Sequence, residues 1–414
     1  MSAAAVAIEG GTLTLGGGLL ALLRPALRLL EPGGVLAVLS DEPSVGEDLR
    51  SFCRVEHHAY LGAEPLAGGR MRHLVGRGAL GVPAGPREAG LALAGGTGRY
   101  GAQRMLSAVP MPAQADPTTG FAPRGAQVEP GGPRSPYDLL EADHVAPPEV
   151  GLLYDQAVAA QWDAGTDIPW HTVQPLAPAL EAAVGQVMTF LAENELSALY
   201  VPSQFVARIH PAYAEVAMFL ATQMADEARH IDVFLRRARA AGGGLGVSAV
   251  TTSRSLLSLL ELDDLAEAAF LLSVLGEGTF LDLLRYVEQH APDEATRVLA
   301  ARARADETRH VHFGMAHVRH AMERDPALAG RLEAAVRRRS ATLAGVGEAP
   351  APLQDALVVY AAGGTQPGAI ARGHAAYRDL LATMAENRIK RLQGAGFAPE
   401  KAQLLSDLHS PNFM

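Results

Sequence analysis

Two copies of one five-residue string decide the fold of this chain: Asp226-Glu227-Ala228-Arg229-His230 and Asp306-Glu307-Thr308-Arg309-His310. Each copy spells Glu-x-x-His and lies inside a long stretch whose apolar residues recur at helical spacing. Because residues three apart lie on one face of a helix, each string offers a carboxylate and an imidazole to one ion. Two strings therefore predict the two halves of a dinuclear metal site.

Two further glutamates complete the pattern that such a site requires. A carboxylate-bridged centre in a four-helix bundle takes one Glu from each of the two remaining helices. Glu195 interrupts an apolar helical stretch upstream of the first string, and Glu277 interrupts an apolar run upstream of the second. The intervals of 32 residues from Glu195 to Glu227 and 30 from Glu277 to Glu307 suit helical hairpins.

The helix face distinguishes Glu195 from its neighbour Glu193. Glu195 falls on the apolar stripe that contains Leu191, whereas Glu193 shares a face with Thr189 and is assigned to solvent. Glu277 has only apolar helical neighbours, so we expect it to be buried. A buried, unpaired carboxylate costs several kcal/mol, and a bound metal removes that cost.

Glu and His at this spacing also occur by chance in helices, as ordinary salt-bridged residues. The duplication with matched upstream glutamates favours a metal site. The predicted ligands are Glu195, Glu227, His230, Glu277, Glu307 and His310. This set of carboxylates and imidazoles without a thiolate favours two Fe ions, with Mn or a mixed Fe/Mn pair as alternatives, over structural zinc.

The Asp that precedes each Glu is the predicted partner of an imidazole. A metal-bound His generally donates its other ring N–H to a carboxylate, a carbonyl or water. We expect crosswise pairs, Asp306 with His230 and Asp226 with His310.

The repeated Asp-Glu-x-Arg-His string resembles that of the ferritin-like di-iron oxygenases and oxidases, over about residues 147–340. The resemblance implies a mainly α fold with a ferritin-like four-helix bundle, in which the ligands named above hold two irons that reduce dioxygen. It further implies a non-haem di-iron oxidoreductase of the monooxygenase type, which hydroxylates or N-oxygenates a small organic substrate. Desaturation and C–C cleavage stay open as reactions. Such chemistry needs external electrons, so a ferredoxin or flavin reductase is the implied partner.

Two positions depart from subgroups of this family. Arylamine N-oxygenases carry an additional His one turn before the second motif, where this chain has Ala303. Multicomponent hydroxylases carry a Thr one turn after the third-helix Glu, where this chain has Leu281. His317, two turns beyond His310, is a further candidate for the site, although a packing role is favoured.

An iron-handling ferroxidase is the alternative function, since ferritins use the same kind of centre to oxidise Fe(II). Ferritins are compact single bundles, whereas this chain has 414 residues and segments on both sides of the predicted bundle. The additional segments favour an enzyme that handles an organic substrate.

The segment of residues 1–80 predicts a small α/β domain with the element order βαβαββ. We expect strands at 11–15, 35–39, 59–61 and 71–75, and helices at 19–30 and from a capping box at Ser44 to Val55. The segment resembles the TusA/SirA sulfur-carrier family over about residues 8–80, but has Gly16-Gly17-Gly18 where those carriers have Cys-Pro. The resemblance implies a degenerate scaffold for dimerisation or redox-partner docking, with the sole cysteine, Cys53, as a packing residue.

The rest of the chain divides by composition. Residues 81–147 are rich in Pro and Gly and predict a connector. Residues 148–345 predict the bundle, which begins with a helix at 148–162 and a Trp-containing corner at 161–170 that packs one end of it. Residues 346–414 predict amphipathic helices and a short tail, with helices at 353–361, 369–392 and 399–408.

Composition narrows the class of protein. The net charge of −10 argues against nucleic acid as a partner, and the single cysteine argues against a disulfide framework and fits the cytoplasm. The longest apolar run, around residues 270–284, contains Glu277 and Asp282 and is too short and too charged to span a membrane. We expect a cytoplasmic enzyme, with the C-terminal helices available for a homodimer.

Overall fold

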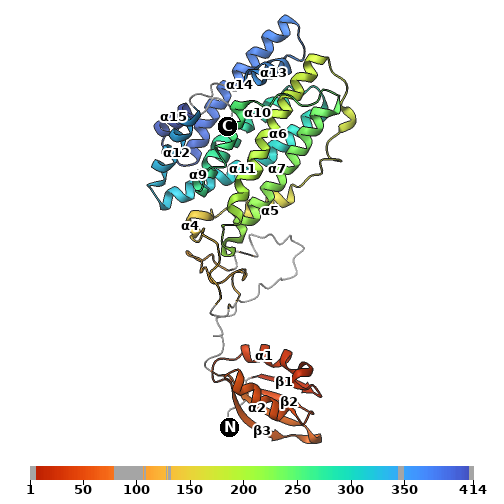
Figure 1. The fold of residues 1–414 in the computed structure, drawn as a ribbon, viewed down its shortest axis with the longest axis vertical. Coiled ribbons are helices and arrows are strands. Elements are labelled where there is room, and N and C mark those ends of the chain that lie inside the picture. The colour runs from red at the N-terminus through yellow and green to blue at the C-terminus, as the bar shows by residue number, and fades with distance from the viewer. Residues whose placement is uncertain are drawn as a thin grey trace. The chain divides into compact units, whose positions relative to one another are not determined.

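The computed structural model describes residues 6–78, 106, 109–126, 128, 132–343 and 349–409. Contacts divide the chain into two units, residues 1–92 with 118–134 and residues 93–117 with 135–414. The first unit contains the sheet and the second contains the long helices (Figure 1). The expected tail at 410–414 and much of the expected connector, residues 79–105, lie outside the described residues.

The described part of the N-terminal unit is a four-stranded sheet with two α-helices on one face. Its elements are β1 (Val6–Gly11), η1 (Leu15–Leu19), α1 (Leu20–Arg28), β2 (Val35–Ser40), α2 (Val45–Val55), β3 (Ala59–Pro65), η2 (Ala67–Gly69) and β4 (Met71–Gly76). The strand order is β1-β2-β4-β3, with β1 parallel to β2 and the other pairs antiparallel. The predicted order βαβαββ is confirmed.

Two local predictions in this unit are wrong. The first strand lies at 6–11 rather than 11–15, because Gly11 has φ of +52° at its end and the chain turns into η1 from Leu15. Ser44 does not cap α2, since its backbone is already helical and its side chain makes no capping bond. Its N–H instead donates to the Glu42 carboxylate at 3.2 Å.

Cys53 lies on the buried side of α2 and belongs to the apolar cluster between the helices and the sheet. Only 2% of the residue is exposed, and burial raises the pKa of its thiol to about 11. A buried neutral thiol of this kind behaves as a small hydrophobic group. The environment of Cys53 therefore agrees with the packing role expected from the sequence.

The second unit is built around four helical segments, one of which is composite. They are α6 (Pro178–Val206), α7 (Ala214–Ala240), the continuous run α9 (Leu265–Ala269), η5 (Phe270–Glu277) and α10 (Gly278–Gln289), and α11 (Glu294–Arg324). α6 packs along α7, η5 and α10 pack along α11, and α7 contacts α11 (Figure 1). The predicted fold class, mainly helical with a four-helix bundle and a small α/β unit, is confirmed.

Further helices pack around this bundle. They are α4 (Ala142–Val145), α5 (Val150–Ala159), η3 (Trp170–Thr172), η4 (Pro211–Tyr213), α8 (Val250–Leu257), α12 (Leu328–Leu343), α13 (Ala351–Ala362), α14 (Pro367–Gly394) and α15 (Pro399–Leu408). α13 packs on α6, α14 packs on α10 and α13, and α15 packs on α12 and α14. The three helices predicted after residue 350 are confirmed within a few residues. No helix in the described residues combines the length and apolarity that crossing a membrane would require.

The bundle core consists of two apolar clusters rather than one. The first contains Val201 of α6 and Phe219 of α7, and the second contains Leu191 of α6 and Phe234 of α7. Along each of these helices the two clusters are separated by a short stretch of buried polar residues. The core therefore leaves a polar layer between two apolar ones.

A fully buried guanidinium ties three helices together away from this polar layer. Arg237 of α7 donates from Nη1 to Glu181 at 3.0 Å, from Nη2 to Asp293 at 2.8 Å and from Nε to Thr296 at 2.7 Å. Its side chain is 0% exposed, and those of Glu181 and Asp293 are 6% exposed. Removing one member would leave buried charges without a partner.

We expect Arg237→Met to lower the free energy of unfolding by about 3–5 kcal/mol, because it leaves Glu181 and Asp293 unpaired. The neighbouring Arg236, paired with Asp232 and 50% exposed, is the matched control. Arg236→Met should change stability by less than about 1 kcal/mol. Urea unfolding followed by tryptophan fluorescence measures this, since Trp162 and Trp170 are the only tryptophans. Equal effects of the two substitutions would contradict the assignment.

We expect Cys53 to resist a thiol reagent such as DTNB at pH 8 in the folded protein. The thiolate is the nucleophile, and a thiol with a pKa of about 11 is almost fully protonated at that pH. Unfolding in urea returns the pKa to about 8.5, so the reaction should become fast. Rapid, stoichiometric labelling of the folded chain at pH 8 would contradict this. Cys53→Ser should leave any turnover intact.

Candidate metal centre

Six side chains from the four bundle segments meet in the polar layer. Glu195 comes from α6, Glu227 and His230 from α7, Glu277 from the end of η5, and Glu307 and His310 from α11. None is more than 2% exposed. The structure thus brings together all six residues that the sequence predicts as ligands.

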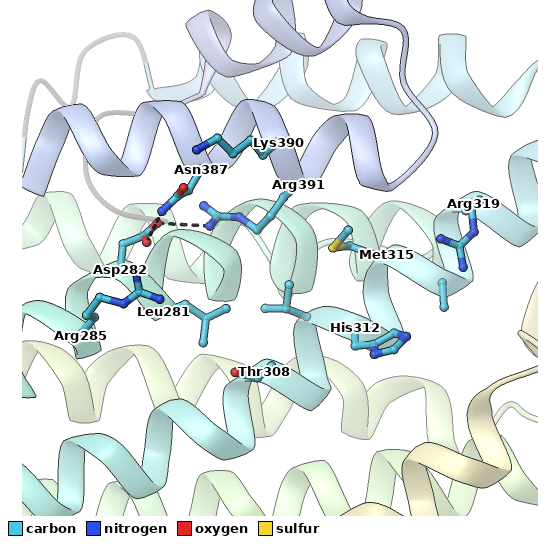
Figure 2. Close-up of a pocket in the computed structure, with 12 residues that line it drawn as sticks. Leu281, Asp282, Arg285, Thr308, His312, Met315, Arg319, Asn387, Lys390 and Arg391 are labelled. Carbon is cyan, nitrogen blue, oxygen red and sulfur yellow. Dashed lines mark hydrogen bonds and ion pairs between the residues drawn. The ribbon is translucent and has the colours of Figure 1, made fainter.

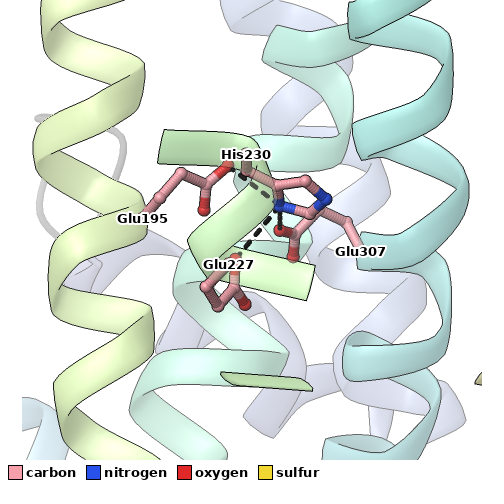
Figure 3. A group of neighbouring side chains, drawn as sticks. All are labelled: Glu195, Glu227, His230 and Glu307. Atoms are coloured by element: carbon pink, nitrogen blue, oxygen red, sulfur yellow. Dashed lines mark hydrogen bonds and ion pairs between the residues drawn. The ribbon is translucent and has the colours of Figure 1, made fainter. Parts of the chain in front are cut away.

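The six residues form two overlapping groups of four. One group is Glu195, Glu227, His230 and Glu307, and the other is Glu227, Glu277, Glu307 and His310. Within each group, one ligand atom from every residue lies within 4.8 Å of the others (Figure 3 shows the first group). Glu227 and Glu307 belong to both groups, so these two carboxylates lie where they can bridge two ions.

Both imidazoles point Nδ1 at the carboxylates. His230 Nδ1 is 3.1 Å from Glu227 Oε2. It also lies 3.4 Å from Glu195 Oε1 and 3.4 Å from Glu307 Oε1. His310 Nδ1 is 3.1 Å from Glu227 Oε1 and 3.3 Å from Glu307 Oε2. The i, i+3 spacing within each string therefore places carboxylate and imidazole on one helix face, as the sequence predicts.

The other ring nitrogen of each imidazole meets an aspartate from the opposite string. His230 Nε2 lies 3.2 Å from Asp306 Oδ2, and His310 Nε2 lies 3.3 Å from Asp226 Oδ2. These are the crosswise pairs expected from the sequence. A carboxylate acceptor keeps the proton on Nε2 and leaves the Nδ1 lone pair directed at the cluster.

Two arginines neutralise these aspartates. Arg229 donates to Asp226 and lies 3.5 Å from Asp306, while Arg309 donates to Asp306 and lies 3.4 Å from Asp226. These two arginines were not among the residues predicted to serve the site. The available signal was their identical position in the two strings, because a residue repeated with the ligands is expected to serve the same site.

Trp162 adds a contact that the sequence analysis missed. Its Nε1–H donates to Asp306 Oδ2 at 2.7 Å, and its ring stacks on His230 at a centroid distance of 6.4 Å. The Arg229 guanidinium lies over the same ring, 5.1 Å from its centroid. The Trp-containing corner packs against the bundle, but it also fixes the aspartate that holds His230.

The third-helix ligand lies at the end of a wide helical turn. η5 has π-helical geometry over Phe270–Glu277, a form that occurs frequently at functional sites. Gln223 Nε2 donates to Glu277 Oε1 at 2.9 Å. α6 contains Pro202 and is assigned as one α-helix throughout, so the wide turn belongs to the third helix.

Electrostatics in the cluster are dominated by burial. Burial, reinforced by Glu227 and Glu307, raises the pKa of Glu195 well above its ordinary value, and burial and Glu307 do the same for Glu277. Burial also acts on Glu227, but His310 and His230 outweigh it and hold the pKa of Glu227 below its ordinary range. Without a cation, burial therefore favours the protonated forms of Glu195 and Glu277, because four ionised carboxylates would carry more charge than two imidazolium groups can neutralise.

Orphaned oxygens show that the residues fit metal ions. Each of the four glutamates has one buried oxygen that no hydrogen bond satisfies: Glu195 Oε1, Glu227 Oε1, Glu277 Oε2 and Glu307 Oε1. All of these except Glu277 Oε2 lie 3.1–3.4 Å from a His Nδ1, which offers them only an ion-pair contact. Leaving such groups unpaired is expensive. Two divalent cations would balance the four glutamates, while the two arginines balance the two aspartates. The oxygen-rich donor set favours Fe or Mn.

Two other candidate residues lie outside both groups. Glu193 is half-buried rather than solvent-facing, because the segment around residue 246 covers its side of α6, where Gly246 N–H donates to Thr189 at 2.8 Å. His317 is 1% exposed and stacks on Phe313, and burial lowers its pKa to about 4. A buried neutral imidazole of this kind agrees with the packing role favoured for His317.

No family model and no curated protein matches this chain. Among solved structures it is similar to R2-like ligand-binding oxidases. One mutant with an aerobically reconstituted Mn/Fe cofactor has 17% identity and a TM-score of 0.44, covering 59% of this chain and 92% of that chain. Another mutant with an Fe/Fe cofactor has 17% identity and a TM-score of 0.40, covering 63% and 93%. Similarity this low establishes neither a shared family nor a shared activity.

We expect the full chain to bind two Fe(II) or Mn(II) ions, measured by elemental analysis after anaerobic loading and desalting. Glu227→Gln should impair both positions, because its carboxylate belongs to both groups. Asp306→Asn should weaken affinity by about 10–100-fold, since partners of ligating imidazoles have effects of that size. Glu193→Gln changes a carboxylate of α6 that lies two positions before Glu195 and belongs to neither group. This variant is the control and should retain both ions. Retention of two tightly bound ions by Glu227→Gln would contradict the shared-ligand geometry.

Proposed function

We propose that this chain is a dioxygen-dependent non-haem oxidoreductase whose six-residue cluster holds two Fe ions or a Mn/Fe pair. The observation that carries the proposal is the sharing of Glu227 and Glu307 between two groups of four ligand residues, with an unpaired oxygen on each glutamate. Such an arrangement suits two ions held close together. When bound, the metal pair supplies the electrons and Lewis acidity needed to activate dioxygen.

The protein's own contribution is orientation and the exclusion of water. Asp306 and Asp226 fix the two imidazole rings, and Trp162 and the arginines fix those aspartates. The two apolar clusters that flank the six candidate ligands keep bulk water from the reacting atoms. This protection matters for an oxidant that would otherwise attack solvent or the protein.

A small and mostly apolar cavity lies beside the centre, although none of the six cluster residues lines it. Gln223, which bonds Glu277, and the adjacent Ser273 line it together with apolar residues. The apolar residues are Val201, Pro202, Phe205, Leu220, Leu265, Ala268, Ala269, Leu272 and Phe313. Its volume of about 20 Å³ is enough for roughly one molecule the size of water. An organic substrate would require side chains of this wall to move.

The monooxygenase type, with hydroxylation or N-oxygenation of a small organic molecule, is our proposed reaction. Oxygen insertion consumes reducing equivalents from outside the substrate, so a ferredoxin or flavin reductase is the proposed electron donor. Since the centre is buried, these electrons must reach it through the protein. A chain of hydrogen bonds from Trp162 through Asp306 to His230 lies on one side of the centre.

Rapid mixing of the anaerobic, Fe(II)-loaded chain with dioxygen tests the proposal. We expect a transient visible absorption and consumption of dioxygen, both altered by a true substrate. The double variant Glu227→Gln/Glu307→Gln should abolish both signals, and Glu193→Gln should preserve them. Uptake of many more than two irons per chain during oxidation would instead support the ferroxidase alternative. Iron-loaded protein that does not react with dioxygen would refute an oxidase of either kind.

A further inference from the structure

A second cavity lies on the outer side of the bundle, between α10, α11 and α14 (Figure 2). Its volume is about 520 Å³, within the usual range for small-molecule sites. None of the six cluster residues lines it. The cavity is therefore a separate site, formed by α14 and by the outer sides of α10 and α11.

The inner wall of this cavity is apolar. Leu281 of α10 and Val311, Met315 and Ala316 of α11 form it, and Val311 and Ala316 are buried. Leu281 follows Glu277 by one helical turn but lines this outer cavity. A ligand lying against this wall would bury apolar surface, which contributes about 25 cal/mol per Å².

The remaining wall is strongly cationic. Arg285, Arg319, Lys390 and Arg391 line the cavity, and Asp282 is the only carboxylate that does. Asp282 already accepts from Asn387 at 2.7 Å and from Arg391 at 3.2 Å (Figure 2). Such a concentration of positive charge stands out in a chain with a net charge of −10. The cavity thus presents an attractive potential to an anion.

Arg391 is the most constrained of these cations. Its side chain is 12% exposed, and its Nε and Nη2 have no hydrogen-bond partner. A Cβ atom at Gly278 would lie 2.5 Å from Nε, so the glycine makes room for the guanidinium. A buried donor without an acceptor is costly, and an anion bound at Nη2 would remove part of that cost.

Two cations at the rim are also free to bind a ligand. Arg285 and Lys390 are exposed, and neither forms a hydrogen bond or ion pair with another described residue. Arg319 is different, since it pairs with Glu149 at 3.2 Å. The free charges therefore come from α10 and α14, with the apolar wall of α11 between them.

We propose that this cavity binds a small organic anion, with its carboxylate or phosphate at Arg391, Arg285 and Lys390 and its apolar body against Leu281, Val311 and Met315. Charge-assisted hydrogen bonds to the cations select the anionic group. The apolar wall selects a ligand with a hydrophobic part over an inorganic ion. This inference does not rest on the proposed redox function, since the two sites share no lining residue.

Calorimetric titration of the metal-loaded full chain tests the site, with phenyl phosphate and hexanoate as probes. Phenol, hexanol and inorganic phosphate are the matched compounds that lack the charge or the apolar body. We expect binding of at least one probe, at least about tenfold tighter than its neutral counterpart and tighter than phosphate alone, and weakened by salt. The double variant Arg285→Gln/Lys390→Gln should weaken binding by about tenfold or more.

Arg372→Gln is the control, because it removes an exposed cation of α14, the helix that carries Lys390, at a position outside the cavity. This substitution should change the affinity less than about twofold. Arg391→Gln should weaken binding further, and the rim double variant keeps the test valid if that protein does not fold. Met315→Gln should weaken phenyl phosphate binding but not change its salt dependence. The proposal is overturned if neither probe binds, if neutral analogues bind equally well, or if inorganic phosphate binds as tightly as phenyl phosphate. Binding in the Glu227→Gln variant would show that the site is independent of the metal centre.

Discussion

The burial of four glutamates in one small space is the constraint on which the rest of the bundle depends. Each carboxylate keeps one oxygen without a hydrogen-bond partner, and the two imidazoles cannot neutralise the set. Such charge is stable between two apolar clusters only when cations compensate it. A pair of metal ions would provide that compensation, so metal binding and folding of the bundle core are expected to be linked.

The two repeated strings also determine how α7 and α11 pair. Each histidine bonds the aspartate of the opposite helix, and each arginine reaches both aspartates. These reciprocal contacts fix the register between the two helices as well as the orientation of the rings. A shift of one helix by a single residue would break all of them, because it would rotate every ligand away from the shared face.

The inner centre and the outer cavity use opposite faces of the same elements. α11 directs Glu307 and His310 inward, while Val311, Met315 and Ala316 line the outer cavity. The helices thus separate an anionic, oxygen-rich interior from a cationic surface site. Because the two sets of residues do not overlap, an anion bound in the outer cavity would not compete with the inner carboxylates for metal ions.

The sequence by itself determined the six clustered residues, the four helices that carry them and the crosswise aspartate pairs, because helical periodicity places residues three apart on one face. It also gave the order of elements in the N-terminal unit. Only the tertiary structure decided that Trp162 bonds Asp306, 144 positions away, that the segment at residue 246 covers Glu193, and that Gly278 receives Arg391. These contacts join segments far apart in the chain, and no local periodicity encodes which of them meet.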